Sequence, residues 1–402
     1  MNPREFDVIV YGATGFTGRL VAEHLQNAYG AGGGVRWAMA GRDQAKLQSV
    51  AQELNAAVPL LHTDARDAAA LGALAQRTRA IITTVGPYQL YGEPMLAACV
   101  ANSTDYVDLC GEPNWIAEMI ARYDADAKRS GARIVISCGF DSIPFDCGVW
   151  FLQRIMRERF GAAAQRVRGR VRRMKGTFSG GTLASMLATI DAAKRDRSLM
   201  ARMADPFALS PERLTPQPRG DKPVEEADIG WSAPFIMAPI NTKNVHRTNA
   251  LTHYAYGRDF VYDEMQWMGA GEAGEKRAKA AANQMRTQML LMALPPSRAL
   301  LRQFVLPKPG QGPSKHERDT GSYEVLFVGE TGDNRVARAS VSGDKDPGYG
   351  STSKIISEAA LCLIDTPRER TPGGLWTPAA AMGDALIERL EAKAGLRFAE
   401  ES

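Results

Sequence analysis

The stretch that most constrains this chain is a strand-like run, residues 8–11, that leads directly into Gly12, Gly15 and Gly18. A helical pattern of apolar residues begins at once, so the stretch predicts a tight strand-to-helix turn. Gly12 permits the turn, Gly15 lets a phosphate approach the backbone, and Gly18 lets the helix pack against the strand. Backbone N–H groups at such a helix start attract phosphate, so the turn predicts a dinucleotide site. Its expected contacts are Gly12, Thr14, Gly15, Phe16, Thr17 and Gly18.

Length and composition are those of an ordinary globular protein with two domains. The chain has 402 residues, of which 45% are hydrophobic and 23% charged. A net charge of +4 is too small to indicate nucleic acid as a partner. Five cysteines without a CxxC pair favour a reducing cytoplasm over a zinc knuckle or a disulfide scaffold. We expect a cytoplasmic protein without a signal peptide or a transmembrane span.

The first 140 residues alternate strands with apolar-periodic helices. The strand candidates are residues 8–11, 35–40, 58–62, 80–85, 105–109 and 133–137. This rhythm predicts βαβ units, and therefore an α/β fold with an N-terminal Rossmann-type parallel sheet. Ligands of such sheets bind at the carboxyl ends of the strands, which is where the unusual residues of this chain are found.

The end of the second strand indicates which dinucleotide is bound. Enzymes selective for NAD place an acidic residue there, but this chain has Ala40 and Gly41 followed by Arg42, with Lys46 one helical turn further on. Guanidinium and ammonium groups suit a 2′-phosphate, so we favour NADP, or NADPH, over NAD. The alternative is that Arg42 only caps a loop. After the third strand, Asp64 either reaches the adenine or caps the next helix.

The fourth strand ends in Val85, Gly86 and Pro87, a rigid turn where the nicotinamide half of the cofactor is expected. Tyr88 and Tyr91 follow it, and their phenols are candidates to face the substrate. For each tyrosine the alternative is packing beneath the turn.

Five motifs together carry a resemblance to a known family. They are GATGFTG (12–18), AGR (40–42), TVGPY (84–88), YVDLCGE (106–112) and CGFDSIPFD (138–146). They resemble the saccharopine-dehydrogenase-like oxidoreductases, and within these the trans-acting enoyl reductases. The likeness covers residues 7–148 and resumes at 346–354 and 373–378. That branch acts with polyketide synthases that lack their own enoyl reductase, in the synthesis of long-chain lipids such as phthiocerol derivatives.

The middle of the chain follows a different pattern. Residues 146–345 contain long alternating segments, which predict an α+β domain for substrate binding or for dimerisation into a homodimer. Predicted there are helices at 151–160, 183–193 and 273–294, strands at 165–175 and 252–262, an exposed loop at 210–223, and a hairpin of 322–328 with 335–342. The resemblance implies that 346–402 returns to pack on the nucleotide domain, residues 1–145.

The strand at 165–175 places Arg166, Arg168, Arg170 and Arg172 on one face. One interpretation is a solvated sheet face whose valines pack on the core from the other side. The alternative is a cationic row that steers an acidic carrier domain or the phosphate of its pantetheine arm.

The pattern of polar residues excludes several kinds of chemistry. None of the eleven tyrosines has a lysine four residues later, which argues against a short-chain dehydrogenase. The histidines lack metal-ligand spacing, so no metal is expected, and a GxSxG serine is absent. Hydride transfer with a nicotinamide cofactor remains.

The resemblance implies reduction of an enoyl thioester, small or bound to a carrier, with an acyl carrier protein or a polyketide synthase as partner. An enolate oxygen then needs a hydrogen-bond donor and the α-carbon needs a proton. The candidate catalytic residues are Tyr88, Tyr91, Asp141, Tyr349 and Lys354. Two alternatives are a saccharopine-reductase-like C–N oxidoreductase and a non-catalytic NADP-binding protein.

Overall fold

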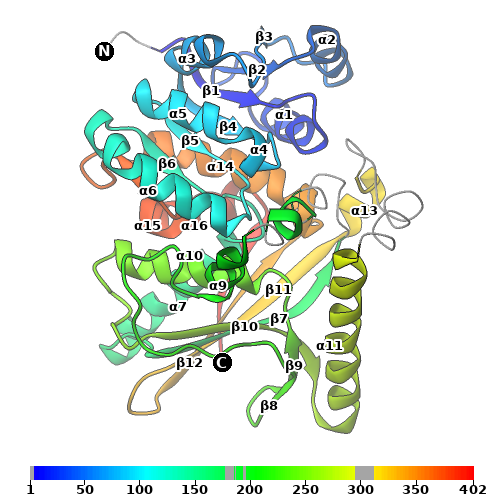
Figure 1. Ribbon diagram of the computed structural model, residues 1–402, viewed down its shortest axis with the longest axis vertical. Helices are drawn as coiled ribbons and strands as arrows, with labels where there is room; N and C mark the ends of the chain where they lie inside the picture. Colours follow the sequence, from blue (N-terminus) through cyan, green and yellow to red (C-terminus); the bar gives the residue numbers. More distant parts are fainter. Residues whose placement is uncertain (1–3, 177–184, 186, 193–195, 295–311) are drawn as a thin grey trace. The chain divides into compact units, whose positions relative to one another are not determined.

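The computed structural model describes residues 4–176, 185, 187–192, 196–294 and 312–402 (Figure 1). The chain divides into two compact units. Unit 1 extends to Ile143 and resumes over Gly348–Gly395, whereas unit 2 comprises Pro144–Pro347 and Leu396–Ser402. Each unit is therefore built from two separate stretches of sequence.

Unit 1 is built on a seven-stranded parallel sheet in the order β13-β6-β5-β4-β1-β2-β3. Its strands are β1 (Phe6–Tyr11), β2 (Trp37–Gly41), β3 (Leu60–His62), β4 (Thr78–Thr83), β5 (Asp105–Val107), β6 (Arg133–Val135) and β13 (Gly374–Trp376). Every residue of β1 and β2 is buried, which explains why these strands read as unbroken apolar runs. The predicted α/β class with a Rossmann-type parallel sheet is confirmed.

The helices of unit 1 form two groups. They are α1 (Phe16–Tyr29), α2 (Gln44–Glu53), α3 (Ala68–Gln76), α4 (Tyr88–Tyr91), α5 (Glu93–Ala101), α6 (Pro113–Ser130), α14 (Thr352–Asp365), α15 (Pro378–Met382) and α16 (Asp384–Lys393). Helix α14 contacts α1, α16 and the central strands β1, β4 and β5, while α5 contacts both α3 and α6 (Figure 1). The late segment that carries α14 is thus part of the core of unit 1.

A buried carboxylate ties α14 to the helix that follows the glycine-rich turn. The Glu358 side chain is fully buried, 2.7 Å from His24 Nε2, and it accepts a hydrogen bond of 2.8 Å from the Tyr29 hydroxyl. Arg389 Nε of α16 donates to it at 2.8 Å. Burial raises the pKa of Glu358, but its bonds to His24, Arg389 and Tyr29 outweigh burial and hold the pKa below its usual range.

Unit 2 is built on a mixed sheet in the order β14-β12-β11-β7-β10-β9-β8, in which only β7 and β10 pair in parallel among the described strands. The strands are β7 (Arg166–Lys175), β8 (Val224–Glu226), β9 (Gly230–Pro234), β10 (Val261–Gly269), β11 (Ser322–Glu330), β12 (Val336–Gly343) and β14 (Leu396–Glu401). The helices are α7 (Ile143–Phe160), α9 (Arg197–Ala204), α10 (Ala238–Leu251), α11 (Gly271–Ala293) and α13 (Lys315–Thr320), and a π-helical turn, η1 (Pro347–Ser351), leads back to unit 1. The predicted hairpin, here β11 with β12, is present.

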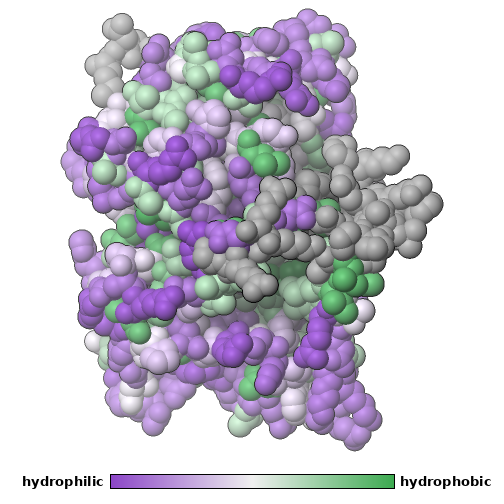
Figure 2. Space-filling view, viewed as in Figure 1, coloured by the Kyte–Doolittle hydropathy of each residue, from purple (hydrophilic) through white to green (hydrophobic). Residues whose placement is uncertain are grey.

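Helix α11 runs alongside β9 and β10 and leaves its far end exposed. Met289, Leu290 and Leu294 are 50%, 59% and 48% exposed. Figure 2 shows an apolar patch on the side of the molecule where this end of α11 lies. No helix in the described part of the chain is both long enough and apolar enough to span a bilayer.

One predicted strand of unit 2 is wrong. Residues 252–260 do not extend β10, because His253 and Tyr254 adopt left-handed backbone angles, with φ of 55° and 59°. The evenly spaced aromatic residues had suggested a strand face. Instead Tyr256 and Phe260 fill the core from a turn, with ring centroids 5.3 Å apart. The helix predicted at 183–193 is present at residues 185 and 187–192, and the other positions of this range lie outside the described residues.

We expect Glu358→Gln to destabilise the protein by roughly 1.5–3 kcal/mol, the usual contribution of hydrogen bonds to a charged group, because a buried amide cannot replace the carboxylate that His24, Tyr29 and Arg389 share, while Asp365 remains as a partner of Arg389. Thermal unfolding followed by circular dichroism measures the loss. Glu369→Gln, an exposed change just beyond α14, is the matched control and should leave the transition in place. Equal midpoints for the two variants would contradict a stabilising role of the Glu358 cluster.

Candidate cofactor site

The glycine-rich turn is a place where backbone packs directly on backbone. Gly12 has a φ of +90°, and a Cβ atom on it would lie 2.7 Å from Val85 Cγ2. A Cβ atom on Gly18 would lie 2.1 Å from the carbonyl oxygen of Gly12. Both approaches are closer than a side chain tolerates, so the turn requires glycine at these positions.

The start of α1 is open to an anion. Gly15 is its N-cap residue, no side chain caps the helix, and no acidic residue lies in its first turn. The positive end of the helix dipole is therefore not compensated by the helix's own residues. Together with the narrow glycine turn, this arrangement fits the pyrophosphate of a dinucleotide.

Two basic side chains follow the end of β2, and only Lys46 has an ion-pair partner among the described residues. Asp43 caps α2 by accepting a 3.0 Å bond from the Lys46 N–H, and the Lys46 ammonium lies 3.6 Å from the same carboxylate. Arg42 is exposed, and its guanidinium makes no ion pair with any residue that the structure describes. The geometry fits recognition of a 2′-phosphate by Arg42, with Lys46 shared between Asp43 and the ligand.

Asp64 does not cap the helix that follows it. That helix, α3, is capped by Asp67. The Asp64 carboxylate instead accepts bonds from the Arg66 guanidinium at 2.8 Å and from the Arg66 N–H at 2.9 Å. These bonds hold the pKa of Asp64 well below its usual range. Its contact with adenine stays a prediction.

Tyr88 has a structural role, because its hydroxyl is hydrogen-bonded to the backbone of two loops. It is 5% exposed, its hydroxyl donates to the Thr83 carbonyl at 3.0 Å, and the same oxygen accepts the Leu109 N–H at 3.0 Å. Burial raises its pKa well above the usual range. Tyr88 therefore joins the loops after β4 and β5. By contrast Tyr91 is 47% exposed, and no described residue bonds its hydroxyl.

Two buried carboxylates that the sequence analysis did not single out support these loops. Glu112 accepts the Tyr88 and Gln89 N–H groups at 2.9 Å each, which satisfies the start of α4. Asp108 accepts the N–H groups of Cys110 at 3.0 Å and Ser137 at 2.8 Å. The only sequence signal for them is their place in an apolar stretch at a strand end. They lock the ends of β4, β5 and β6 to one another.

Asp141, after β6, has the opposite character. Its loop is anchored by a 3.0 Å bond from the Phe140 N–H to Thr352 Oγ1 of α14. No described side chain or backbone group bonds the Asp141 carboxylate itself. Burial raises its pKa to about 6. Asp141 is thus an acid that holds a proton at a higher pH than an ordinary aspartate.

The segment that returns to unit 1 brings Tyr349 to the glycine-rich turn. The ring of Tyr349 packs edge-on against Phe16, with centroids 5.2 Å apart, and the residue is 3% exposed. Lys354 lies half-buried in the first turn of α14. The structure therefore gathers Phe16, Tyr349 and the start of α14 in one unit, although more than three hundred residues separate them.

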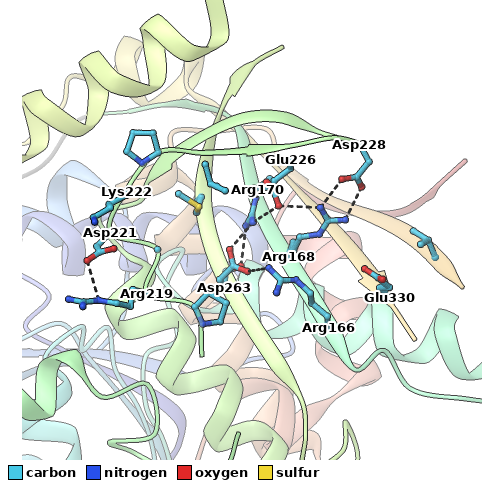
Figure 3. Close-up of a pocket in the computed structure, with 16 residues that line it drawn as sticks. Arg166, Arg168, Arg170, Arg219, Asp221, Lys222, Glu226, Asp228, Asp263 and Glu330 are labelled. Atoms are coloured by element: carbon cyan, nitrogen blue, oxygen red, sulfur yellow. Dashed lines mark hydrogen bonds and ion pairs between the residues drawn. The ribbon is translucent and has the colours of Figure 1, made fainter. Parts of the chain in front are cut away.

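Three arginines of the β7 row, Arg166, Arg168 and Arg170, line a cavity of about 730 Å³ in unit 2 (Figure 3). Val167 and Val171 face the core as expected. Arg170 is only 1% exposed, however, and it bonds both Glu226 and Asp263 at 2.7 Å. Arg166, Arg168 and Arg172 also have carboxylate partners. The middle of the row is therefore buried in ion pairs, its two ends are partly exposed, and the row is not a free cationic surface.

Comparison with known proteins identifies the family. Residues 8–135 match the family model described as the saccharopine dehydrogenase NADP binding domain. A Mycobacterium tuberculosis protein, provisionally named trans-acting enoyl reductase, is 42% identical over 97% of this chain and 96% of its own. The trans-acting enoyl reductase of Mycobacterium bovis (strain BCG / Pasteur 1173P2) is 36% identical over 97% of each chain. This chain belongs to the trans-acting enoyl reductase family.

The fold agrees with this assignment. Saccharopine dehydrogenase (L-Glu forming) from Saccharomyces cerevisiae aligns with a TM-score of 0.55 and 12% identity, over 99% of this chain and 100% of that one. This member of the trans-acting enoyl reductase family is an NAD(P)-dependent oxidoreductase, and its cofactor is NADP(H). The predicted cofactor is confirmed, and the non-catalytic alternative is not supported.

We expect Arg42→Ala to weaken NADPH binding by roughly 1.5–3 kcal/mol, the contribution of a charge-assisted hydrogen bond to the 2′-phosphate. Binding of NADH, which lacks that phosphate, should not change. Titration of both cofactors, monitored by their fluorescence, measures the difference. Arg129→Ala, an exposed change in the last turn of α6, is the control. An equal loss for both cofactors would rule out this role of Arg42.

Proposed function

We propose that this enzyme uses NADPH to reduce the C=C bond of an α,β-unsaturated acyl thioester in lipid or polyketide synthesis. The observation that carries the proposal is the similarity, at 36–42% identity over nearly the whole chain, to relatives named trans-acting enoyl reductase. When bound, NADPH supplies a hydride for the β-carbon of the substrate. The protein has to orient the acyl group and provide a proton for the α-carbon.

The cofactor contacts in this proposal follow the geometry of unit 1. Gly12, Gly15 and Gly18, with the N–H groups of Thr14, Phe16 and Thr17 around them, receive the pyrophosphate. Arg42 and Lys46 hold the 2′-phosphate, and Asp64 lies on the adenine side. The turn formed by Val85, Gly86 and Pro87 lies against the nicotinamide half. Support comes from the turn that only glycine permits, the helix start without a side-chain cap, and the Arg42 guanidinium, which has no ion-pair partner in the described part of the chain.

Asp141 is the proton donor in this proposal. Its carboxyl group transfers a proton to the α-carbon as the β-carbon gains hydride, so that the C=C bond becomes a CH–CH bond and Asp141 becomes a carboxylate. Solvent then returns the proton. A pKa of about 6 suits this task, because an acid is most effective when its pKa lies near the working pH. An ordinary aspartate would be almost fully ionised there.

The remaining candidates take supporting roles. Tyr91 has an exposed hydroxyl that can donate to the enolate oxygen of the thioester. Tyr88 is a positioning residue, since both bonds of its hydroxyl hold loops together. Tyr349 supports Phe16 beside the glycine-rich turn, and Lys354 provides positive charge at the start of α14.

The word trans-acting in the relatives' names supports a substrate carried on a separate protein. We therefore propose an acyl carrier protein or a carrier domain of a polyketide synthase as partner. The β7 arginines are weak candidates for that contact, because carboxylates already neutralise Arg168 and Arg170.

We expect Asp141→Asn to lower kcat by about 10²–10⁴-fold, the usual contribution of general acid catalysis. In the parent enzyme, kcat should fall as pH rises through about 6, because the protonated acid is lost. This fall in kcat near pH 6 should be absent in Asp141→Asn, while the Kd for NADPH stays constant. Steady-state oxidation of NADPH with an enoyl-CoA substrate across a pH series measures both effects.

Two further variants separate catalysis from folding. Tyr88→Phe removes the two loop contacts and should lower the unfolding temperature without changing the shape of the pH profile. Asp126→Asn, a surface change on α6, should affect neither measurement. If kcat of Asp141→Asn still falls as pH rises through about 6, another group delivers the proton.

A further inference from the structure

Unit 2 contains a second cavity, of about 810 Å³, which adjoins the one lined by the β7 arginines and shares the segment 218–221 and Asp263 with it. It lies among α10, α11, the start of β10 and the segment 201–221. Most side chains that line it are apolar. They include Met203, Phe207, Leu214, Phe235, Met285 and Met289. Its size and lining are typical of pockets that bind small apolar molecules.

A buried ammonium group lies in the wall of this apolar cavity. Lys243 is 1% exposed, and its Nζ donates to the carbonyl oxygens of Met203 and Pro239 at 2.7 Å each. These bonds use two of its three N–H donors, and no described residue takes the third. Burial lowers the pKa of Lys243 to about 8, so the group is still mostly charged at neutral pH.

None of the carboxyl groups that line the cavity forms an ion pair with Lys243 among the described residues. The charge of Asp205 favours the ammonium form of Lys243, but the Asp205 carboxylate is paired with Arg213 at 2.8 Å. Asp221 is paired with Arg219 and Asp263 with Arg170. Burial raises the pKa of Glu264 to about 8, so this acid, which is bonded to Tyr262 and Asn241, is mostly neutral. On α11, the exposed Arg286 also lines the cavity and has no ion pair within the described part of the chain. An apolar chain with an oxygen-bearing head matches this arrangement.

We propose that this cavity binds an aliphatic acyl chain, with a carbonyl or carboxylate oxygen of the ligand accepting the third N–H of Lys243. In this proposal the apolar lining contacts the aliphatic chain of the ligand. Met289 lines the cavity and is also half exposed, so the apolar lining is continuous with the exposed apolar end of α11. Figure 2 shows the apolar patch at that end of α11. The ligand is either the acyl part of the substrate or a separate fatty acid. Only the first source rests on the proposed function.

Direct binding of a fluorescent fatty acid, cis-parinaric acid, tests the cavity without cofactor or turnover. Ala282 lines the cavity on α11, and Ala282→Trp should weaken binding by at least about tenfold by filling it. Ala280→Trp makes the same change on the exposed side of α11 and should bind like the parent. Lys243→Met should also weaken binding about tenfold. Thermal melts confirm that each variant is folded.

Failure of the parent protein to bind, or equal affinities of the two tryptophan variants, would overturn the proposal. Steady-state kinetics with enoyl-CoA substrates of short and long acyl chain tells whether the bound acyl group belongs to the substrate or to a separate fatty acid. If Ala282→Trp raises KM only for the long substrate, the cavity takes the acyl part of the substrate. If KM is unchanged for both while the probe is still lost, the ligand is a separate lipid. Both results uphold the binding site, and neither depends on which residue donates the proton.

Discussion

The contact between Gly18 and the carbonyl group of Gly12 fixes where α1 begins, and much of unit 1 depends on that position. Only a residue without Cβ lets the helix lie this close to β1. Helix α1 then carries His24 to Glu358, a contact across 334 positions of sequence. Because α14 also packs on the central strands β1, β4 and β5, the cofactor turn and the returning segment are held together in one core.

The loops at the carboxyl ends of the strands show how one residue type takes different roles. Asp108 and Glu112 are buried, and the backbone N–H groups that they accept offset part of the cost of burial and fix them in the scaffold. Burial raises the pKa of Asp108 and of Asp141 alike, to about 6, but the Asp141 carboxyl accepts no hydrogen bond from the described residues, so its oxygens remain available to a ligand. The number of donors around a carboxylate thus separates a structural acid from a candidate for proton transfer.

The sequence predicted what depends on local pattern and missed what depends on distant partners. The strands of the parallel sheet are buried on both faces, so their apolar runs are visible in the sequence. Strand β13 has three residues and exists through its pairing with β6. Arg170 is paired with Glu226 and Asp263, which lie 56 and 93 positions further along the chain. Because partners at that distance are not visible in the residue spacing, the sequence left open that the row is a cationic surface without ion-pair partners. Asp141 was found by its place after a strand, but its desolvation needed the fold.

The interleaved course of the chain has a consequence for its synthesis. The parallel sheet of unit 1 needs β13, and the mixed sheet of unit 2 needs β14, which pairs with β12. A nascent chain that ends before residue 374 therefore leaves β6 and β12 as open sheet edges. Such edges are templates for pairing with other chains. Neither unit can complete its sheet on the ribosome early, so newly made protein depends on protection from aggregation until its last elements emerge.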